Sequence, residues 1–315
     1  MQILTPPFST DIPPLVASIG FFDGVHRGHR FLIGELIAEA KREGLSSAVI
    51  TFRNHPRKLI DPSFSPELLS SFDEKMTLLE QTGVDYCIVL DFTPQIRDLS
   101  ASRFIQEILS EQLHTKTLIT GYDHRFGKNR EEGFEDYCRY GKACGMQVLR
   151  ETGYAPDGLH VSSSEVRRKL LSGHLSTANE LLGRSYNLEG VVEEGFRIGR
   201  KIGFPTANIR PCEPDKLIPK QGVYAVYVEI DGIARPGMLN IGIRPTVHDS
   251  GNISIEAHLF GFDGDLYGKT VNIRFIEFLR EERKMESLGE LQRQLEKDKI
   301  AAQSVLSLHE AVSTK

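Results

Sequence analysis

The chain has 315 residues, of which 26% are charged and 40% are hydrophobic. That length predicts about two domains, each large enough to bury its own core, and the composition is typical of a folded globular protein. The 38 Lys and Arg residues against 43 Asp and Glu give a formal net charge of −5. No overall basic field is therefore available for nucleic acid or for an anionic membrane, and an anionic ligand would need a local site.

The sequence contains no apolar run close to the ~18 residues that span a bilayer. Residues 1–14 lack the basic start and apolar centre of a signal peptide. The four cysteines form no CxxC pair and are too few to staple a chain of this length, so we interpret them as reduced thiols. We expect a cytoplasmic protein with no membrane partner.

The first half alternates apolar runs with amphipathic segments, the pattern of parallel strands joined by helices. A helix is predicted over 28–42, because apolar residues recur there at helical spacing before Gly44 ends the pattern. Further helices are predicted around 104–109 and over 134–143. This order indicates a doubly wound, Rossmann-like α/β domain. Strands are predicted at 15–20, 48–52, 86–90, 117–120 and 147–149.

Two short helices follow, at about 163–171 and 177–182, and Gly183 ends the second. We place the domain boundary at this glycine. The predicted N-terminal domain is 1–183 and the predicted C-terminal domain is 184–315.

The rhythm of the sequence changes after residue 186 to short apolar strands separated by turns such as Asp231-Gly232 and Asp263-Gly264. This pattern predicts a small antiparallel β-barrel. A last helix over about 288–306, with an apolar stripe, is predicted to pack against it. Barrel strands are predicted at 191–192, 223–230, 238–243, 253–260 and 270–278.

The first predicted strand runs into the turn Phe21-Phe22-Asp23-Gly24-Val25-His26-Arg27-Gly28-His29 and then into a helix. Such a helix start presents unpaired backbone N–H groups to a phosphate, and the glycines of the turn let the phosphate approach. His26 and His29 can donate to charge that builds on a five-coordinate α-phosphorus. A lone histidine or a Gly-rich turn would be weak evidence, but this pair resembles the HxGH signature of the nucleotidyltransferase superfamily. The glycines assigned to phosphate binding are Gly20, Gly24 and Gly28.

The segment from Val161 to Arg167 supports the same site. A capping box of Ser162 and Glu165 would explain two of its residues. It does not explain Arg167, because an arginine one turn into a helix is unfavourable unless an anion lies nearby. The segment resembles a later motif of the superfamily, which implies that Ser163, Ser164 and Arg167 hold the β- and γ-phosphates that leave as pyrophosphate.

Two loops, 51–56 and 121–127, follow the second and fourth predicted strands, and ligands bind at such carboxyl ends of parallel strands. They contain His55 and His124. For these two histidines, a surface position and a ligand contact both stay open.

Four glycines precede the run Phe204-Pro205-Thr206-Ala207-Asn208 in the C-terminal half. Glycines in strands usually mark bulges or bends, but here they also open space for a nucleotide. Thr206 and Asn208 alternate across Ala207, so both side chains face one way and offer hard oxygen ligands to Mg²⁺. The glycines are Gly190, Gly195, Gly199 and Gly203, of which we assign Gly190, Gly199 and Gly203 to ATP.

Glu256 shares one face of a predicted strand with Ser254 and His258. It lies either outside the barrel, as a solvated carboxylate, or in a polar cleft. In a cleft it could take the proton from an attacking hydroxyl group.

The whole chain resembles the bifunctional bacterial riboflavin kinase and FAD synthetase family. The resemblance rests on the nine-residue turn above, on Phe204 to Asn208 preceded by Gly203, and on the segments 222–225, 240–246 and 265–268. It implies that Thr206 and Asn208 bind Mg²⁺ and ATP, that Glu256 is the base, and that Arg280 lies by the flavin.

Four places depart from the family pattern, and three of them are Glu132, Ser164 and Gly261, where the family often has Gly, Thr and Asp. Asp123-His124 stands where the family often has an acid or amide followed by Phe, so a polar ring replaces an apolar one among the expected flavin contacts. We assign Asp123 to flavin binding on this resemblance.

The resemblance implies two reactions in one chain. The barrel would transfer the γ-phosphoryl group of ATP to riboflavin, giving FMN. In the α/β domain the FMN phosphate would attack the α-phosphorus of a second ATP, giving FAD and pyrophosphate. Both steps would need Mg²⁺, and neither needs a covalent enzyme intermediate.

Two alternatives belong to other classes. An aminoacyl-tRNA synthetase relative also opens with HxGH, and 284–287 faintly echoes its Lys-Met-Ser-Lys loop, but the second lysine and a basic stripe for tRNA are missing. A flavin carrier without turnover would bind flavin and release neither ADP nor pyrophosphate. The presence of His26, His29, Asn208 and Glu256 argues against the carrier.

Overall fold

The computed structural model divides into two compact units, Met1–Ser163 and Ser164–Lys315. It describes residues 1–9, 11–61, 63–121, 124–151, 153–154, 161–195, 199, 202–243 and 253–313.

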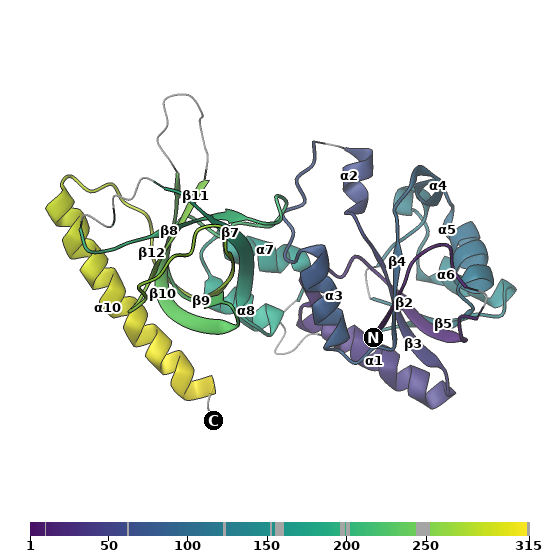
Figure 1. Cartoon of the computed structure of the whole chain (residues 1–315). Helices are drawn as coiled ribbons and strands as arrows, with labels where there is room; N and C mark the ends of the chain where they lie inside the picture. The colour runs from purple at the N-terminus through teal and green to yellow at the C-terminus, as the bar shows by residue number, and fades with distance from the viewer. Residues whose placement is uncertain are drawn as a thin grey trace. The chain divides into compact units, whose positions relative to one another are not determined.

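The first unit is built on a six-stranded parallel sheet of order β1-β4-β3-β2-β5-β6 (Figure 1). All five predicted strands are present, with ends that differ by at most two residues. The sequence pattern missed only the edge strand β1, which is too short to show a periodicity. The strands are β1 (Gln2–Leu4), β2 (Leu15–Ile19), β3 (Ser46–Phe52), β4 (Tyr86–Leu90), β5 (Thr115–Thr120) and β6 (Gln147–Arg150).

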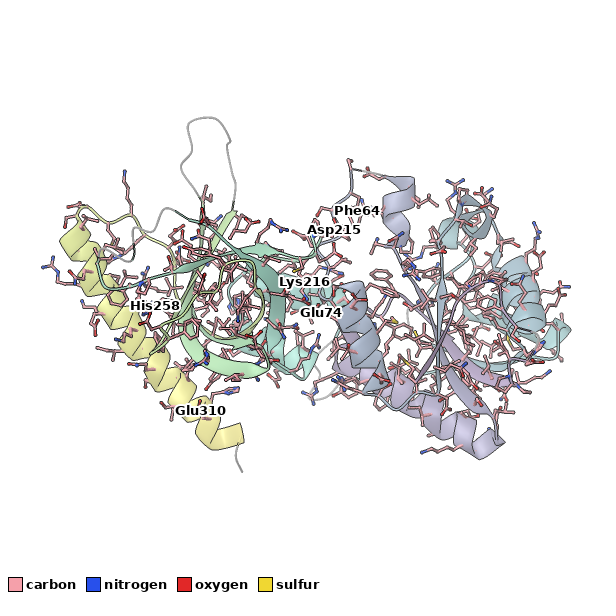
Figure 2. The ribbon with its side chains drawn as sticks, viewed as in Figure 1. Phe64, Glu74, Asp215, Lys216, His258 and Glu310 are labelled. Atoms are coloured by element: carbon pink, nitrogen blue, oxygen red, sulfur yellow. The ribbon has the colours of Figure 1, made fainter. Side chains whose placement is uncertain are left out.

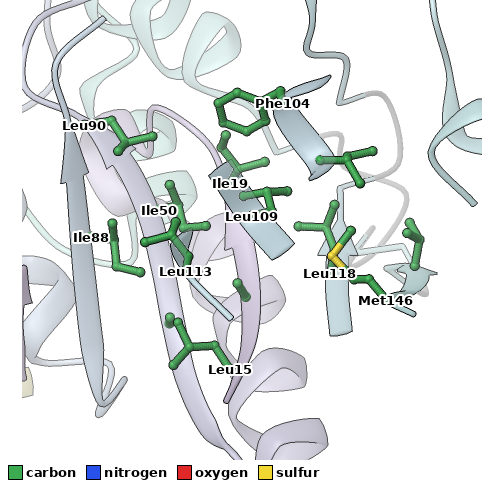
Figure 3. Close-up of a cluster of buried hydrophobic side chains, with 14 of the residues drawn as sticks. Leu15, Ile19, Ile50, Ile88, Leu90, Phe104, Leu109, Leu113, Leu118 and Met146 are labelled. Atoms are coloured by element: carbon green, nitrogen blue, oxygen red, sulfur yellow. The ribbon is translucent and has the colours of Figure 1, made fainter. Parts of the chain in front are cut away.

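Both faces of this sheet are covered, because alternate residues of each strand enter different apolar clusters. In β2, Leu15 and Ile19 pack in one cluster and Val16 packs in the other. Figure 3 shows the first cluster, in which Phe104 and Leu109 cover that sheet face. Two-sided burial is why these strands read as continuous apolar runs, and it confirms the doubly wound class.

The longest helix of this unit, α1 (Arg27–Glu43), ends at Gly44 in the left-handed conformation, as predicted. The helix predicted around 104–109 is a wider-turned π-helix, η2 (Phe104–Gln112), that continues from α5 (Ala101–Arg103). The remaining segments are η1 (Asp23–Val25), α2 (Pro56–Ile60), α3 (Phe72–Glu80), α4 (Pro94–Arg97), η3 (Lys128–Arg130) and α6 (Phe134–Ala143).

The second unit contains a closed antiparallel barrel of order β10-β11-β8-β7-β12-β9, which confirms the predicted barrel. The helix α10 (Leu288–Ser313) packs along β9, β10 and β12 (Figure 1). Its Glu310, near the end of the helix in Figure 2, accepts a hydrogen bond from the Tyr227 hydroxyl at 2.9 Å. The strands are β7 (Tyr186–Glu193), β8 (Ala207–Pro211), β9 (Gly222–Ile230), β10 (Ile233–Ile243), β11 (Ile253–Leu259) and β12 (Thr270–Arg280).

Two helices precede the barrel, α7 (Ser163–Leu171) and α8 (Leu175–Leu182). The side chain of Asn179 in α8 donates to Phe275 O at 3.0 Å and accepts from Tyr186 N at 2.7 Å. These bonds hold α8 against β12 and β7. The boundary between independently folding domains, placed at residue 183, stays a prediction.

Candidate active sites

The turn between β2 and α1 has an unusual backbone. Phe22 and Val25 have positive φ angles of 53° and 38°, which side chains rarely adopt, and Gly24 has a φ of 75°. Phe22 and Val25 stay in these conformations because their side chains are buried in the core. The turn therefore has a fixed shape before any ligand binds.

His26 and His29 lie together at the start of α1, as predicted. Their rings stack with centroids 3.7 Å apart, and Nδ1 of His26 accepts a hydrogen bond from His29 N at 3.3 Å. That bond fixes the tautomer of His26 with its proton on Nε2. Burial, followed by the neighbouring His26, holds the pKa of His29 well below its usual range, so His29 is neutral at pH 7.

One ring nitrogen of His29, Nδ1, is buried and has no hydrogen-bond partner within the part of the chain that the structure describes. Buried polar atoms without partners are rare in proteins and need an explanation. A bound phosphate group would supply the missing partner.

The three glycines of this turn differ in what they allow. Gly28 faces Val161 O, which a Cβ atom would meet at 3.1 Å, and Gly20 faces the Phe22 ring at a similar distance. Only Gly24 needs its left-handed backbone. Their assignment to phosphate binding stays a prediction.

The start of α7 reaches the turn through Ser163, whose hydroxyl donates to Asp23 O at 3.0 Å. Ser164 is exposed, and Arg167 is half-buried on the same helix. Their contacts with phosphates stay predictions.

A cavity of about 820 Å³ lies at the carboxyl ends of the parallel strands. Its lining includes Ile19 and Phe21 after β2, Phe52 at the end of β3 and Phe92 after β4. Five Arg or Lys residues and one acid, Asp98, also line it. This is a local basic site in a chain of negative net charge, with apolar walls for a flat ring system.

His55 and His124 both line this cavity, so neither is an ordinary surface residue. The Phe21 ring meets the His55 ring edge-on at 4.8 Å. Burial lowers the pKa of His124 to about 4, and its Nε2 has no hydrogen-bond partner among the described residues. The neutral His124 ring can therefore exchange a hydrogen bond with a ligand. Asp123 lies outside the described residues.

In the barrel, Thr206, Asn208 and Glu256 come together. Glu256 on β11 pairs directly with Asn208 on β8, and the Thr206 hydroxyl donates to Glu256 Oε2 at 3.2 Å. Glu256 is half-buried, and Ser254 and His258 on its face of the strand are buried. Glu256 is therefore not a fully solvated carboxylate, and its position in a cleft stays a prediction.

Two further residues support this cluster, and the sequence analysis gave neither of them a role. Asn240 on β10 also pairs directly with Glu256, so three strands bring polar side chains into one row. The ring Nδ1 of His258 donates to Pro205 O at 2.8 Å, since a carbonyl oxygen can only accept, and this bond ties the Thr206 segment to β11. The place of Asn240 beside Glu256 follows from the strand register, which a single sequence does not show.

The glycines before this cluster are closely packed. A Cβ atom at Gly195 would lie 1.9 Å from Asn208 Nδ2, and one at Gly199 would lie 2.1 Å from Phe204 O. At Gly190 it would meet Ile209 at 2.5 Å, so the close approach of β8 accounts for that glycine. Gly203 has a φ of 82° and open space around it. Contacts of Gly190, Gly199 and Gly203 with ATP stay predictions.

A second cavity, of about 350 Å³, begins at Thr206. Its walls are Val192, Ala257 and Leu259 from the barrel and the loop Phe262–Tyr267. Thr206 thus lines this cavity and also donates to the carboxylate of Glu256.

Arg280, predicted to lie by the flavin, forms a two-pronged ion pair with Asp298 of α10. The nitrogens Nε and Nη2 lie 2.8 and 2.6 Å from the carboxylate oxygens, and Asp298 is only 4% exposed. Asp298 also accepts from Gln294 at 2.8 Å. The pair anchors α10 to the end of β12.

We expect Asp298→Ala to lower the free energy of unfolding by about 3–5 kcal/mol, because it leaves the Arg280 charge without its partner. The exposed Glu296→Ala, on the same helix, should change it by less than about 0.5 kcal/mol. Urea unfolding followed by circular dichroism measures both. Equal stability of the two variants would show that α10 is held by apolar packing alone.

Comparison with known proteins finds two family models that match this chain. Residues 9–165 match FAD synthetase, and residues 182–306 match riboflavin kinase. The chain is 37% identical to a bifunctional riboflavin kinase/FMN adenylyltransferase of Pseudomonas fluorescens, over 92% of both chains. It is 36% identical to the protein of the same description from Escherichia coli strain K12, over 93% of both.

A solved structure has the same fold over nearly the whole chain. It is titled a macrolide-efflux protein from Streptococcus pneumoniae, is 27% identical, and superposes with a TM-score of 0.85 over 95% of this chain and 97% of that one. Within the described residues, no helix is long and apolar enough to cross a membrane.

Proposed function

Because the chain belongs to the family of bifunctional riboflavin kinases/FMN adenylyltransferases, and so phosphorylates riboflavin to FMN and adenylylates FMN to FAD with ATP, we propose which residues carry each reaction. The observation that carries the proposal is that each compact unit has its own cavity and its own set of polar groups.

The barrel carries the kinase reaction. Glu256 accepts the proton of the riboflavin 5′-hydroxyl group as the oxygen attacks the γ-phosphorus of ATP, and ADP leaves. Thr206 and Asn208 hold the phosphates, with Gly199 and Gly203 beside them. The cavity next to Thr206, which has both polar and apolar walls, takes the nucleoside part of ATP. Arg280 lies by the flavin.

The donor set of the barrel cluster fits Mg²⁺. A hydroxyl, an amide oxygen and a carboxylate lie together, and all are hard oxygen ligands. Among the described residues, no cluster of three or more His, Cys, Asp or Glu side chains could hold a metal ion. Thr206 and Asn208 would therefore hold Mg²⁺ together with the phosphates of ATP. When bound, the ion neutralises charge on the transferred phosphoryl group.

The first unit carries the adenylyl transfer. The FMN phosphate attacks the α-phosphorus of the second ATP, and pyrophosphate leaves. His26, His29 and the N–H groups at the start of α1 stabilise the charge on the phosphorus oxygens. Gly20, Gly24 and Gly28 let the phosphates approach, and Ser163, Ser164 and Arg167 hold the leaving pyrophosphate. The flavin ring lies in the cavity lined by Phe52 and His124, and Asp123 stays a predicted flavin contact.

Chromatography of flavins after incubation with riboflavin, ATP and Mg²⁺ tests the division of labour, and titration with an ATP analogue should give two nucleotide sites. A single site would contradict it. Both reactions consume ATP, which supports the expected cytoplasmic location.

We expect excess EDTA to stop both FMN and FAD formation, and added Mg²⁺ to restore them. Thr206→Val should raise the Mg²⁺ concentration for half-maximal FMN formation by about tenfold, because it removes one oxygen ligand. It should leave FAD formation from supplied FMN unchanged. An equal change in both reactions would contradict the assignment of Thr206 to the kinase reaction alone.

A further inference from the structure

Lys75 is a buried lysine that the proposed mechanism does not use. It lies on α3 among the apolar residues Met76, Leu78 and Leu79, and is only 3% exposed. Lysines are almost never buried this completely without a specific partner. The contacts of its ammonium group therefore indicate why the chain places a charge at this position.

The ammonium group of Lys75 ties together the ends of two strands. Its Nζ donates to Phe52 O at 2.9 Å, and to Phe21 O and Thr51 Oγ1 at 3.2 Å each. The Thr51 hydroxyl itself donates to Phe21 O at 3.1 Å. All three donor positions of the ammonium are thus used, and two of the acceptors belong to residues that line the large cavity.

Residues 69 and 70, which lie just before α3, also bind the turn between β2 and α1, here named the histidine turn. The buried Asp23 carboxylate accepts from the backbone N–H groups of Leu69 and Ser70 at 3.0 and 3.1 Å. The Ser70 hydroxyl accepts from Gly24 N at 3.0 Å. Residues 69–75 therefore contact the turn at Phe21, Asp23 and Gly24.

The ammonium group of Lys75 also contacts the ring of Phe21, which lines the cavity. It lies 4.2 Å from the centroid of the Phe21 ring, a cation–π distance. The Phe21 ring also meets the His55 ring edge-on at 4.8 Å. Lys75 thus fixes both the backbone and the ring of the residue that joins the cavity to the histidine turn.

We propose that Lys75 is a positioning residue for adenylyl transfer, holding the ends of β2 and β3 so that the cavity floor and the histidine turn keep their relative placement. This inference rests on the proposed assignment of adenylyl transfer to the first unit. Displacing the reacting groups of such a site by about 1 Å lowers the rate by up to ~100-fold, so the loss of a positioning residue should be measurable.

The charge of Lys75 gives the proposal a pH signature. Burial lowers the pKa of Lys75 to about 8, against the attraction of Asp23 and Cys87. Two other titratable groups near it, Cys87 and His29, do not change charge around pH 8. Burial raises the pKa of Cys87 to about 11 and holds the pKa of His29 well below its usual range. As the pH rises through about 8, the ammonium loses its charge and one of three donors. FAD formation should fall over this range.

The test compares Lys75→Met, which keeps the apolar stem, with Lys142→Met at an exposed position of α6 in the same unit. FAD formation from supplied FMN is followed between pH 6.5 and 9.5, with riboflavin phosphorylation in the same samples and circular dichroism as the check on folding. We expect kcat/KM for FAD formation to fall about 10- to 100-fold in Lys75→Met, mostly in kcat. The remaining rate of Lys75→Met should not decrease as the pH rises through about 8, so this variant should lack the alkaline fall in FAD formation. Lys142→Met should show the rate and the pH dependence of the unmodified protein.

A second variant keeps the inference testable if Lys75→Met does not fold. Thr51→Val removes one acceptor and leaves the charge, so it should give a smaller loss with the alkaline fall retained. A normal rate in folded Lys75→Met, or an unchanged alkaline fall in it, overturns the inference. If His29→Ala also forms FAD at the normal rate, the assignment of adenylyl transfer to this turn fails instead.

Discussion

With His29→Ala, FMN accumulates and FAD formation falls by about 100-fold or more when riboflavin, ATP and Mg²⁺ are supplied. The reason is electrostatic: the side chain lies at the start of α1 with a buried nitrogen that lacks a partner in the described structure. A fixed donor at this place stabilises charge on the α-phosphorus in the transition state, and removal of one such donor typically costs 100- to 1000-fold in kcat. Chromatography of the flavins measures both products in one experiment.

Two controls accompany this variant. His114→Ala changes another half-buried histidine of the same unit. His114 precedes the amino end of β5, whereas the proposed site lies at the carboxyl ends of the strands, so this variant should form FAD at the normal rate. The kinase reaction of the His29 variant reports that the barrel is intact. FAD formation at the normal rate in His29→Ala would count against the site.

The second large effect is expected in the barrel. Glu256→Ala should lower FMN formation from riboflavin by 100- to 10,000-fold, the usual range for loss of a general base. Supplied FMN should still be converted to FAD, because His26, His29 and the large cavity belong to the other unit. Glu256→Gln should be almost as slow, since the amide keeps the shape and cannot take a proton.

Glu229→Ala provides the matched control for this experiment. Glu229 is also a half-buried glutamate on a barrel strand, and it faces Asn272 of β12 rather than the Thr206 cluster. Loss of both reactions in a folded sample of Glu256→Ala would indicate one shared site. A normal rate of FMN formation would remove Glu256 from the mechanism.

The sequence predicted the parts of the site that depend on local pattern. The histidine turn follows a buried strand and opens a helix, and both flanking elements show in the spacing of apolar residues. Thr206 and Asn208 are separated by one residue on an extended segment, and strand geometry places them on one side. The family resemblance added Glu256, whose position pattern alone left open between solvent and a cleft.

The tertiary structure decided the contacts between residues far apart in the chain. The pairing of Glu256 with Asn208 and Asn240 is set by strand register, and register follows from closure of the whole barrel. The cavity position of His124 depends on which loops meet at the end of the sheet.

Lys75 shows the same limit most clearly. In sequence it is one charged residue outside every element predicted above, and most charged residues face solvent. Only the folded chain brings two backbone carbonyls and a hydroxyl within reach of its ammonium group. Amino-acid order therefore determined most of the strands, the class of both domains and the residue types of two candidate sites, because periodicity and motif are local. The packing determined which distant groups complete those sites, because hydrogen bonds form between neighbours in space.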